Sequence, residues 1–267
     1  MNVPGDKDRA TLRKAVFGLP EIDYKEWYDR VGAQIGWDFG GIRCRVENAA
    51  WDFYEVVAKY CDGRTVLLDI GCGGGEKLIG LAAKVFLLIG IDASAAMIQA
   101  AQNNLLQTGL ANVRFFQMRA QGLMFPDGFF QCVSCRHCSF DAGEVARVLA
   151  KDGVFLTQQV SEGDKLNIKR AFGRGQNYGQ PDGTQKAAYE RELKQAGFRE
   201  VQALEYDAAE YYQTAGDLLF LLKHAPIVPD FGEVPGDWEI FRRLVAEFQT
   251  GKGIYTNARR YLFIARK

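Results

Sequence analysis

The segment at residues 69–76, Asp-Ile-Gly-Cys-Gly-Gly-Gly-Glu, limits the possible folds of this chain more than any other. It follows an apolar run at residues 65–68 that is typical of a buried strand in a parallel sheet. Leucine and isoleucine resume at Leu78, which indicates a helix after the glycines. Glycine tolerates positive φ and lets a ligand approach the backbone, since it carries no Cβ. The segment therefore predicts a strand-to-helix turn that binds a ligand.

A second apolar run, at residues 85–91, indicates another buried strand, and it ends at Asp92. A carboxylate at such a strand tip can accept hydrogen bonds from both hydroxyls of a ribose. Because the carboxyl ends of parallel strands meet at one edge of a sheet, the glycine turn and Asp92 should lie together. The two features predict a nucleoside site at that edge.

The glycine spacing decides which nucleoside the turn suits. A dinucleotide fingerprint requires Gly-x-Gly-x-x-Gly, but counting from Gly71 and Gly73 places Glu76 where the third glycine belongs. An NAD-binding oxidoreductase is therefore a disfavoured alternative. The observed order is an acid inside the strand end, Asp69, followed by glycines at every second position. This order resembles the first motif of the Rossmann-like S-adenosyl-L-methionine (SAM) methyltransferases.

Four further segments are similar to the menaquinone and ubiquinone C-methyltransferases of that family. They are residues 125–130, Cys135-Arg136, residues 147–153 and residues 196–198. The resemblance implies an α/β fold, a doubly wound seven-stranded Rossmann-like methyltransferase sheet with six parallel strands and one antiparallel strand. It also implies a SAM-dependent methyltransferase activity, with S-adenosyl-L-homocysteine as the product.

The expected organisation is an N-terminal helical cap at residues 1–61 and a SAM-binding methyltransferase domain at residues 62–267. Substrate-side insertions are expected near residues 161–185 and, as a C-terminal insertion, near residues 225–253. The first of these is rich in glycine and is expected to be a mobile connection after the fifth strand. The resemblance implies that this edge borders the acceptor pocket, so a substrate loop is the alternative.

Two helices are expected at the borders of the sheet. Residues 7–60 should be helical, because apolar residues from Val46 to Tyr60 recur at helical spacing and form a stripe that packs on the sheet. A second helix should run through Leu149, before a fifth strand that opens at Val154.

The resemblance implies how the cofactor would bind. Asp69 would hold the methionine ammonium, the glycine turn the carboxyl end of the methionine, and Asp92 the ribose. The residues expected to contact the cofactor are Asp69, Gly71, Cys72, Gly73, Gly75, Asp92, Ala93, Met97, Ala120, Gln121 and Cys135.

One position departs from the family pattern at the adenine end. An aspartate that accepts from the adenine amino group usually stands where this chain has Arg119, and arginine cannot accept a hydrogen bond. The backbone N–H of Ala120 and the carbonyl of Gln121 remain available. The departure leaves a catalytically silent SAM-binding protein as an alternative to the enzyme.

The acceptor side of the site has fewer sequence signals. A general base is needed only if the acceptor must lose a proton, and His137, just after the fourth-strand tip, is the candidate; a structural loop histidine is the alternative. Tyr28, Arg136 and Tyr178 are expected to line the acceptor pocket. Aromatic residues before residue 40 either cover the core or form a lid over that pocket.

The charge balance bears on the acceptor. Lysine plus arginine and aspartate plus glutamate each number 33, whereas nucleic-acid enzymes usually carry excess positive charge. A small-molecule acceptor is therefore expected, with an RNA methyltransferase as the alternative. No apolar stretch reaches the roughly 20 residues of a membrane span, and the first residues do not resemble a signal peptide. A cytoplasmic protein without a membrane partner is expected; its oligomeric state is not predicted.

Three of the six cysteines follow the spacing Cys132-x-x-Cys135-x-x-Cys138, which could suggest a metal site. Side chains alternate between the two faces of a strand, so Cys132 and Cys135 should point in opposite directions. We therefore expect reduced thiols and no metal.

Overall fold

The structure, a computed structural model, describes residues 40–267. The predicted lid aromatics and Tyr28 lie outside these residues. None of the helices described is long and apolar enough to cross a membrane.

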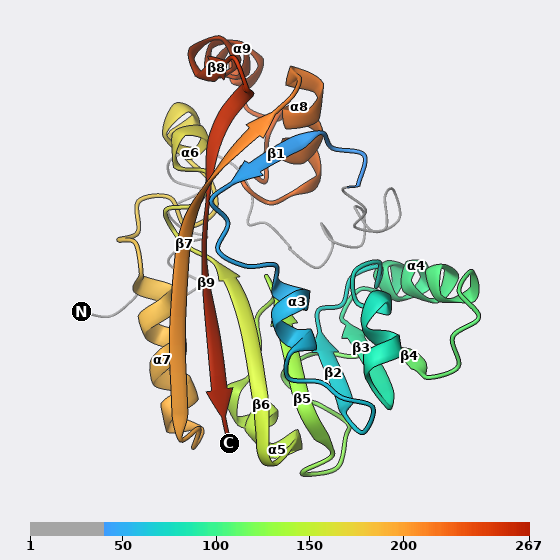
Figure 1. Cartoon of the computed structure of the whole chain (residues 1–267). Helices are drawn as coiled ribbons and strands as arrows, with labels where there is room; N and C mark the ends of the chain where they lie inside the picture. Colours follow the sequence, from blue (N-terminus) through green and yellow to red (C-terminus); the bar gives the residue numbers. More distant parts are fainter. Residues whose placement is uncertain (1–39) are drawn as a thin grey trace.

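One sheet runs through the described chain, with the strand order β1-β7-β9-β6-β5-β2-β3-β4 and β8 paired to β9 (Figure 1). The strands are β1 (Cys44–Glu47), β2 (Val66–Ile70), β3 (Leu87–Asp92), β4 (Val113–Gln117), β5 (Phe130–Arg136), β6 (Leu149–Val160), β7 (Glu200–Tyr212), β8 (Gln249–Thr250) and β9 (Gly253–Arg266). The helices are α3 (Phe53–Ala58), η1 (Ile79–Lys84, a 3-10 helix), α4 (Ala95–Leu106), α5 (Ala142–Val148), α6 (Leu166–Phe172), α7 (Thr184–Gln195), α8 (Ala215–His224) and α9 (Asp237–Phe248).

The pairing directions confirm the predicted doubly wound sheet. β2 to β6 pair in parallel, and β9 is antiparallel to both β6 and β7, so β7 has the direction of β6. These seven strands are the six parallel and one antiparallel strands expected. Within residues 40–267 the sheet has nine strands, because β1 adds to the edge of β7 and β8 forms a short hairpin with β9.

Both faces of the sheet are covered. Leu67 and Cys132 pack in one core with residues of α3, η1 and α4, whereas Leu68 and Cys135 pack in the opposite core with residues of α5 and α7. The expected opposite orientation of Cys132 and Cys135 is confirmed. The central strands β2, β3, β5 and β6 are therefore mostly buried on both faces, as the apolar runs of β2 and β3 indicated.

β7 and β9 are 13 and 14 residues long, and they extend past the other strands (Figure 1). Their extensions carry a third core, with contributions from α6, α8 and α9. We call this part the upper lobe: β1, α6, α8, α9 and β8, with the ends of β7 and β9 that they cover. It stands beyond the carboxyl ends of β2, β3, β5 and β6, which we call the carboxyl edge.

The helical expectation for residues 46–60 is wrong in its first part. Cys44–Glu47 forms β1, because the outer edge of β7 offers unpaired backbone groups and β1 satisfies them. The helix α3 begins only at Phe53, where the carboxylate of Asp52 caps it by accepting from the N–H groups of Tyr54 and Glu55. Phe53 and Val57 are buried in the core of the sheet, as the stripe predicted.

Three other local expectations need correction. The segment at residues 161–185 contains α6 and the start of α7, and its first residues are buried, because charged partners from distant strands hold them. Leu149 begins β6 instead of continuing α5, since Leu149 pairs with Phe130 of β5. The glycine turn leads into a 3-10 helix, η1, where an ordinary helix was expected.

Candidate functional site

The glycine turn after β2 requires glycine at two positions for steric reasons. Gly71 and Gly75 have φ values of 74° and 73°. A Cβ on Gly71 would lie 2.5 Å from the Cβ of Cys138, and one on Gly75 would lie 2.6 Å from the ring of Phe115. The turn thus combines a left-handed backbone with close neighbours, which only glycine allows without strain.

Asp92 links the tip of β3 to this turn. One of its carboxylate oxygens accepts from the N–H of Gly73 at 3.0 Å, and the other accepts from the N–H of Ser94 at 2.9 Å. Ser94 in turn caps α4 by accepting from the N–H of Met97. The structure therefore brings Asp92, the glycine turn and the start of α4 together.

Asp69 is fully buried at the end of β2 and has only neutral hydrogen-bond donors. Its carboxylate accepts from the hydroxyls of Ser134, at 2.5 Å, and Tyr54, at 3.3 Å. Burial raises the pKa of Asp69 to about 7, although the two hydroxyls and the nearby Arg136 oppose the rise. No described cation forms an ion pair with this carboxylate, so a cationic ligand would relieve its desolvation.

Sequence reasoning missed Tyr54 and Ser134. The β2–β5 register pairs Asp69 directly with Ser134. This pairing could have been predicted from the sequence if the alignment of the two parallel strands had been known. Tyr54 lies on α3 but outside the predicted apolar stripe, and its ring centroid lies 5.9 Å from the guanidinium carbon of Arg136. Tyr54 thereby connects Asp69 to the expected acceptor residue Arg136.

His137 follows β5 at the carboxyl edge with a φ of 55°, unusual for a residue other than glycine. Its ring Nε2 lies 3.0 Å from the amide nitrogen of Gln158, whose carbonyl accepts from the indole N–H of Trp51 at 2.8 Å. Because an indole can only donate, Gln158 must present its N–H to the histidine. The Nε2 of His137 is thus an acceptor, and the proton of the neutral ring sits on Nδ1.

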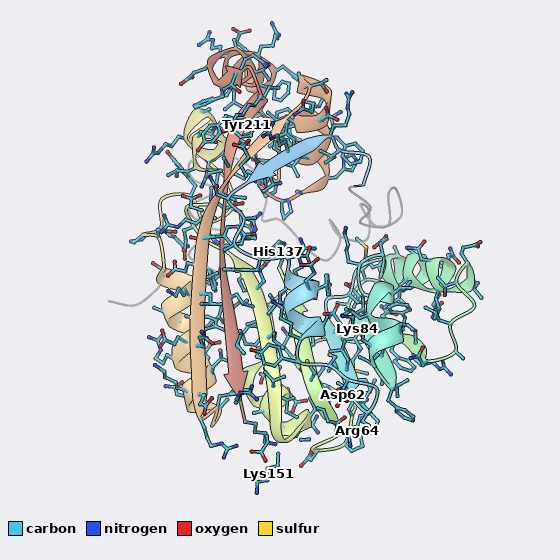
Figure 2. All side chains as sticks on the ribbon, viewed as in Figure 1. Asp62, Arg64, Lys84, His137, Lys151 and Tyr211 are labelled. Atoms are coloured by element: carbon cyan, nitrogen blue, oxygen red, sulfur yellow. The ribbon has the colours of Figure 1, made fainter. Side chains whose placement is uncertain are left out.

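The surroundings keep this imidazole neutral. Burial lowers the pKa of His137 well below its usual value, and the nearby Arg136, Arg260 and Lys165 add to the effect. Figure 2 shows His137 where the sheet meets the upper lobe, with Asp62, Arg64 and Lys151 at the opposite end of the sheet.

Trp51 also contacts β7, since its ring packs edge-on against Tyr206 with the centroids 4.5 Å apart. Segments from three parts of the sequence, before α3, after β5 and in β7, therefore converge at the carboxyl edge. Sequence reasoning missed Trp51, Gln158 and Tyr206, because no local pattern distinguishes them from residues of an ordinary core.

The adenine-end residues lie on the loop after β4. The N–H of Met118 donates to the carbonyl of Asp92 at 2.9 Å, which anchors this loop beside the site. Ala120 is buried, whereas Arg119 and Gln121 are exposed. Tyr178 is 41% exposed on the loop after α6, and no described contact joins it to the other site residues.

Four of the six cysteines, all free thiols, contact one another in pairs on the two faces of the sheet. The thiol of Cys135 lies 3.1 Å from the carbonyl of Cys138, while the thiols of Cys132 and Cys61 are hydrogen-bonded to each other. Between residues 40 and 267, no group of three histidine, cysteine or acidic side chains is arranged to hold a metal. A shallow depression on α7 contains none of the site residues; it is lined by Ala187, Glu190, Arg191, Lys194 and Gln195.

The chain is similar to known proteins over this region. The profile of the family described as "Methyltransferase domain" matches residues 67–153, which include the glycine turn, Asp92 and β5. The uncharacterized methyltransferase YcgJ of Bacillus subtilis is 37% identical over 103 residues, covering 36% of this chain and 41% of YcgJ.

The ubiquinone/menaquinone biosynthesis C-methyltransferase UbiE of Hahella chejuensis is 40% identical over 120 residues, covering 40% of this chain and 47% of UbiE. The match thus spans less than half the length of either relative. The crystal structure of YcgJ superposes with a TM-score of 0.58 at 20% identity, covering 80% of this chain and 97% of that one. At this identity the superposition establishes the shared fold.

Proposed function

Because residues 67–153 form a class I methyltransferase domain, whose cofactor is SAM, we propose that the whole protein transfers a methyl group from SAM to a small-molecule acceptor. SAM supplies an electrophilic methyl group and departs as S-adenosyl-L-homocysteine. The residues of the chain bind the two reactants, orient them and exclude water.

The buried carboxylate of Asp69 is the observation that carries this proposal. It lies beside the glycine turn, bonded to two neutral hydroxyls, so it can bind a cation without breaking an existing ion pair. The methionine ammonium of SAM is such a cation. Asp92 would accept the ribose hydroxyls, since each carboxylate oxygen can accept more than one hydrogen bond.

Other residues would complete the cofactor site. The backbone of Gly71, Cys72, Gly73 and Gly75 would face the methionine, and Ala93 and Met97 would pack beside the ribose. Ala120 and Gln121 would bind the adenine, with Cys135 at the floor of the pocket.

A small acceptor fits the position of the site better than a nucleic acid. The upper lobe stands beyond the carboxyl edge (Figure 1), and we expect it to limit the acceptors that can approach from that side. The chain also has equal numbers of acidic and basic residues, so it lacks the general positive charge that phosphate binding favours.

His137 remains the candidate general base, since its imidazole is held neutral. Its Nε2 accepts from Gln158, so proton uptake at this atom requires the Gln158 amide to turn away. His137→Asn should then lower kcat and leave SAM affinity unchanged. We also propose a cytoplasmic location, because all six cysteines are free thiols, as a reducing compartment favours.

Calorimetry with SAM, S-adenosyl-L-homocysteine and NAD, followed by transfer of an isotopically labelled methyl group, tests the proposal. We expect both sulfur compounds to bind and label to enter small organic acceptors. Tight NAD binding without SAM binding would contradict the cofactor assignment. Labelling of RNA alone would select the RNA methyltransferase, and SAM binding without transfer to any acceptor would select the silent SAM-binding protein.

A further inference from the structure

The carboxyl edge beyond Asp69 gathers hydrogen-bond donors whose capacity the described residues leave unused. The guanidinium of Arg136 is exposed at the tip of β5 and lies over the ring of Tyr54, and among residues 40–267 it makes no hydrogen bond or salt bridge. The hydroxyl of Tyr206 has no hydrogen-bond partner among residues 40–267, although the side chain is half-buried. The Nδ1–H of His137 has none in the same range.

These donors lie in one part of the molecule. Arg136 and Arg260 both act electrostatically on His137 and on Tyr206. Trp51 touches Tyr206 through its ring and reaches His137 through Gln158. The donors therefore surround one region at the junction of the sheet and the upper lobe, where Figure 2 shows His137.

The nearby carboxylates already accept hydrogen bonds from other groups, so they are not available as acceptors for these unused donors. Asp164 accepts from the side chain of Arg260 and from the N–H of Arg259. Glu210 accepts from Lys165 at 2.6 Å and from the hydroxyl of Tyr212 at 2.7 Å. What this region lacks is a hydrogen-bond acceptor with negative charge.

Arg136 also lies within electrostatic range of Asp69, and without a ligand it partly compensates that buried carboxylate. Once an ammonium occupies Asp69, the guanidinium becomes surplus positive charge. The sulfonium and the methionine carboxylate of SAM offset each other in net charge, so they would leave this surplus unchanged. An anion bound beside the cofactor would restore the charge balance.

The aromatic rings indicate the shape of this anion. Trp51, Tyr54 and Tyr206 are all partly exposed, and they line the same region as the donors. Partly exposed rings around a cation favour a flat aromatic ligand with a charged group at one end.

We propose that the methyl acceptor is a small aromatic carboxylate, held at its carboxylate by Arg136 and the hydroxyl of Tyr206 and at its ring by Trp51 and Tyr54. This inference rests on the proposed methyltransferase function. It assigns Arg136 and Tyr206 as the residues that select the charge of the acceptor.

The test uses the full chain saturated with S-adenosyl-L-homocysteine and pairs of probes that differ only in charge. The probes are benzoate, 4-hydroxybenzoate and 3,4-dihydroxybenzoate, each compared with its neutral amide by calorimetry. We expect at least one carboxylate to bind about tenfold more tightly than its amide, as a charged hydrogen-bonded pair supplies. Arg136→Gln should bring that ratio close to one.

Tyr206→Phe, which keeps the ring against Trp51, should weaken the preferred carboxylate by about threefold to tenfold. Arg64→Gln and Tyr211→Phe are matched controls away from the site (Figure 2), and they should leave the ratio unchanged. Neither site variant should alter the affinity for S-adenosyl-L-homocysteine by more than about twofold at pH 8.5, where Asp69 is ionised.

The outcomes separate the two proposals. If S-adenosyl-L-homocysteine does not bind, the proposed function fails. If it binds but no carboxylate of the panel binds more tightly than its amide, the charge assignment of the acceptor is overturned and the methyltransferase stands. A preference that survives Arg136→Gln would likewise overturn the role given to Arg136.

Discussion

The upper lobe and the carboxyl edge treat their buried charges in opposite ways. In the segments that connect the helices of the upper lobe, Arg174 follows α6, is 7% exposed, and pairs with Asp230 at 3.2 Å and with Asp237 at 2.8 Å. At the carboxyl edge, Asp69 is fully buried with two neutral hydroxyls as its donors.

The difference distinguishes charges that stabilise the fold from charges that are available to bind a ligand. A buried ion pair whose members satisfy each other offers nothing to a ligand, and it becomes costly only when one member is removed. A buried carboxylate with neutral donors is costly as it stands, and a cation can relieve that cost. Removing the charge of Arg174 should therefore lower the stability of the protein. Removing the charge of Asp69 should instead lower SAM affinity and leave the stability unchanged or higher.

The largest effect is expected in the lobe. Arg174→Met should lower the free energy of unfolding by about 3–5 kcal/mol, because it leaves Asp230 and Asp237 buried without a counter-ion. Urea denaturation measures this change. The control Arg242→Met removes an exposed pair with Glu239 and should cost less than about 1 kcal/mol. Equal effects of the two variants would show that the buried network is not a structural requirement.

Asp69→Asn should weaken cofactor binding and not the stability of the fold. SAM affinity should fall by about 1.5–3 kcal/mol, the value of a hydrogen bond to a charged group, while the melting temperature of the free protein stays the same or rises. Calorimetry and thermal unfolding measure the two quantities. Asp152→Asn, at an exposed ion pair with Arg199, is the matched control. A large loss of stability in Asp69→Asn would show that the charge of Asp69 stabilises the fold, as the charge of Arg174 does.

The titration of Asp69 gives a prediction for pH. Its folded pKa of about 7 lies above the value of 3.8 for an unperturbed aspartate, so the native state binds the extra proton. The free protein should therefore lose stability as pH rises from about 4 to 7, whereas SAM affinity should increase over the upper part of that range. Below pH 7, the affinity should fall by up to about tenfold per pH unit, and binding should release a proton.

Calorimetry in buffers of different ionisation enthalpy measures this proton release at pH 6. Asp69→Asn should abolish it. Proton release of the same size in that variant would assign the titration to another group.

The smallest effect is expected at the adenine end, where Arg119 is exposed and has no ion pair among the described residues. Arg119→Asp supplies the acceptor that the family pattern has at this position, and it should tighten SAM binding by about 0.5–1.5 kcal/mol. An analogue without the adenine amino group should gain nothing. Weaker SAM binding by this variant would mean that Arg119 contacts the cofactor itself.

The sequence predicted the elements whose local pattern also determines their packing. β2, β3 and β5 have apolar runs that are buried on both faces, and the glycines after β2 meet a steric demand that no other residue satisfies. The positions of Asp69 and Asp92 followed from those strands.

The rest depends on partners far away in the sequence. The pairing of Arg174 with Asp230 spans 56 positions, so the glycines of residues 161–185 indicate a mobile connection, whereas the structure has α6, the start of α7 and buried residues such as Arg174 there. β1 exists because β7 leaves an edge, which overrides the helical spacing around Val46. Tyr206 belongs to the site only because β7 passes Trp51.

The long β7–β9 ladder has a consequence for how the molecule unfolds. Its register is continuous from the pair Glu200–Arg266 to the pair Tyr212–Ile254, so the same two strands belong to the sheet and to the upper lobe. Separating the lobe from the sheet would require breaking hydrogen bonds in the middle of that ladder. The lobe should therefore not swing as an independent lid, and amide exchange along β7 and β9 should report a single cooperative unit.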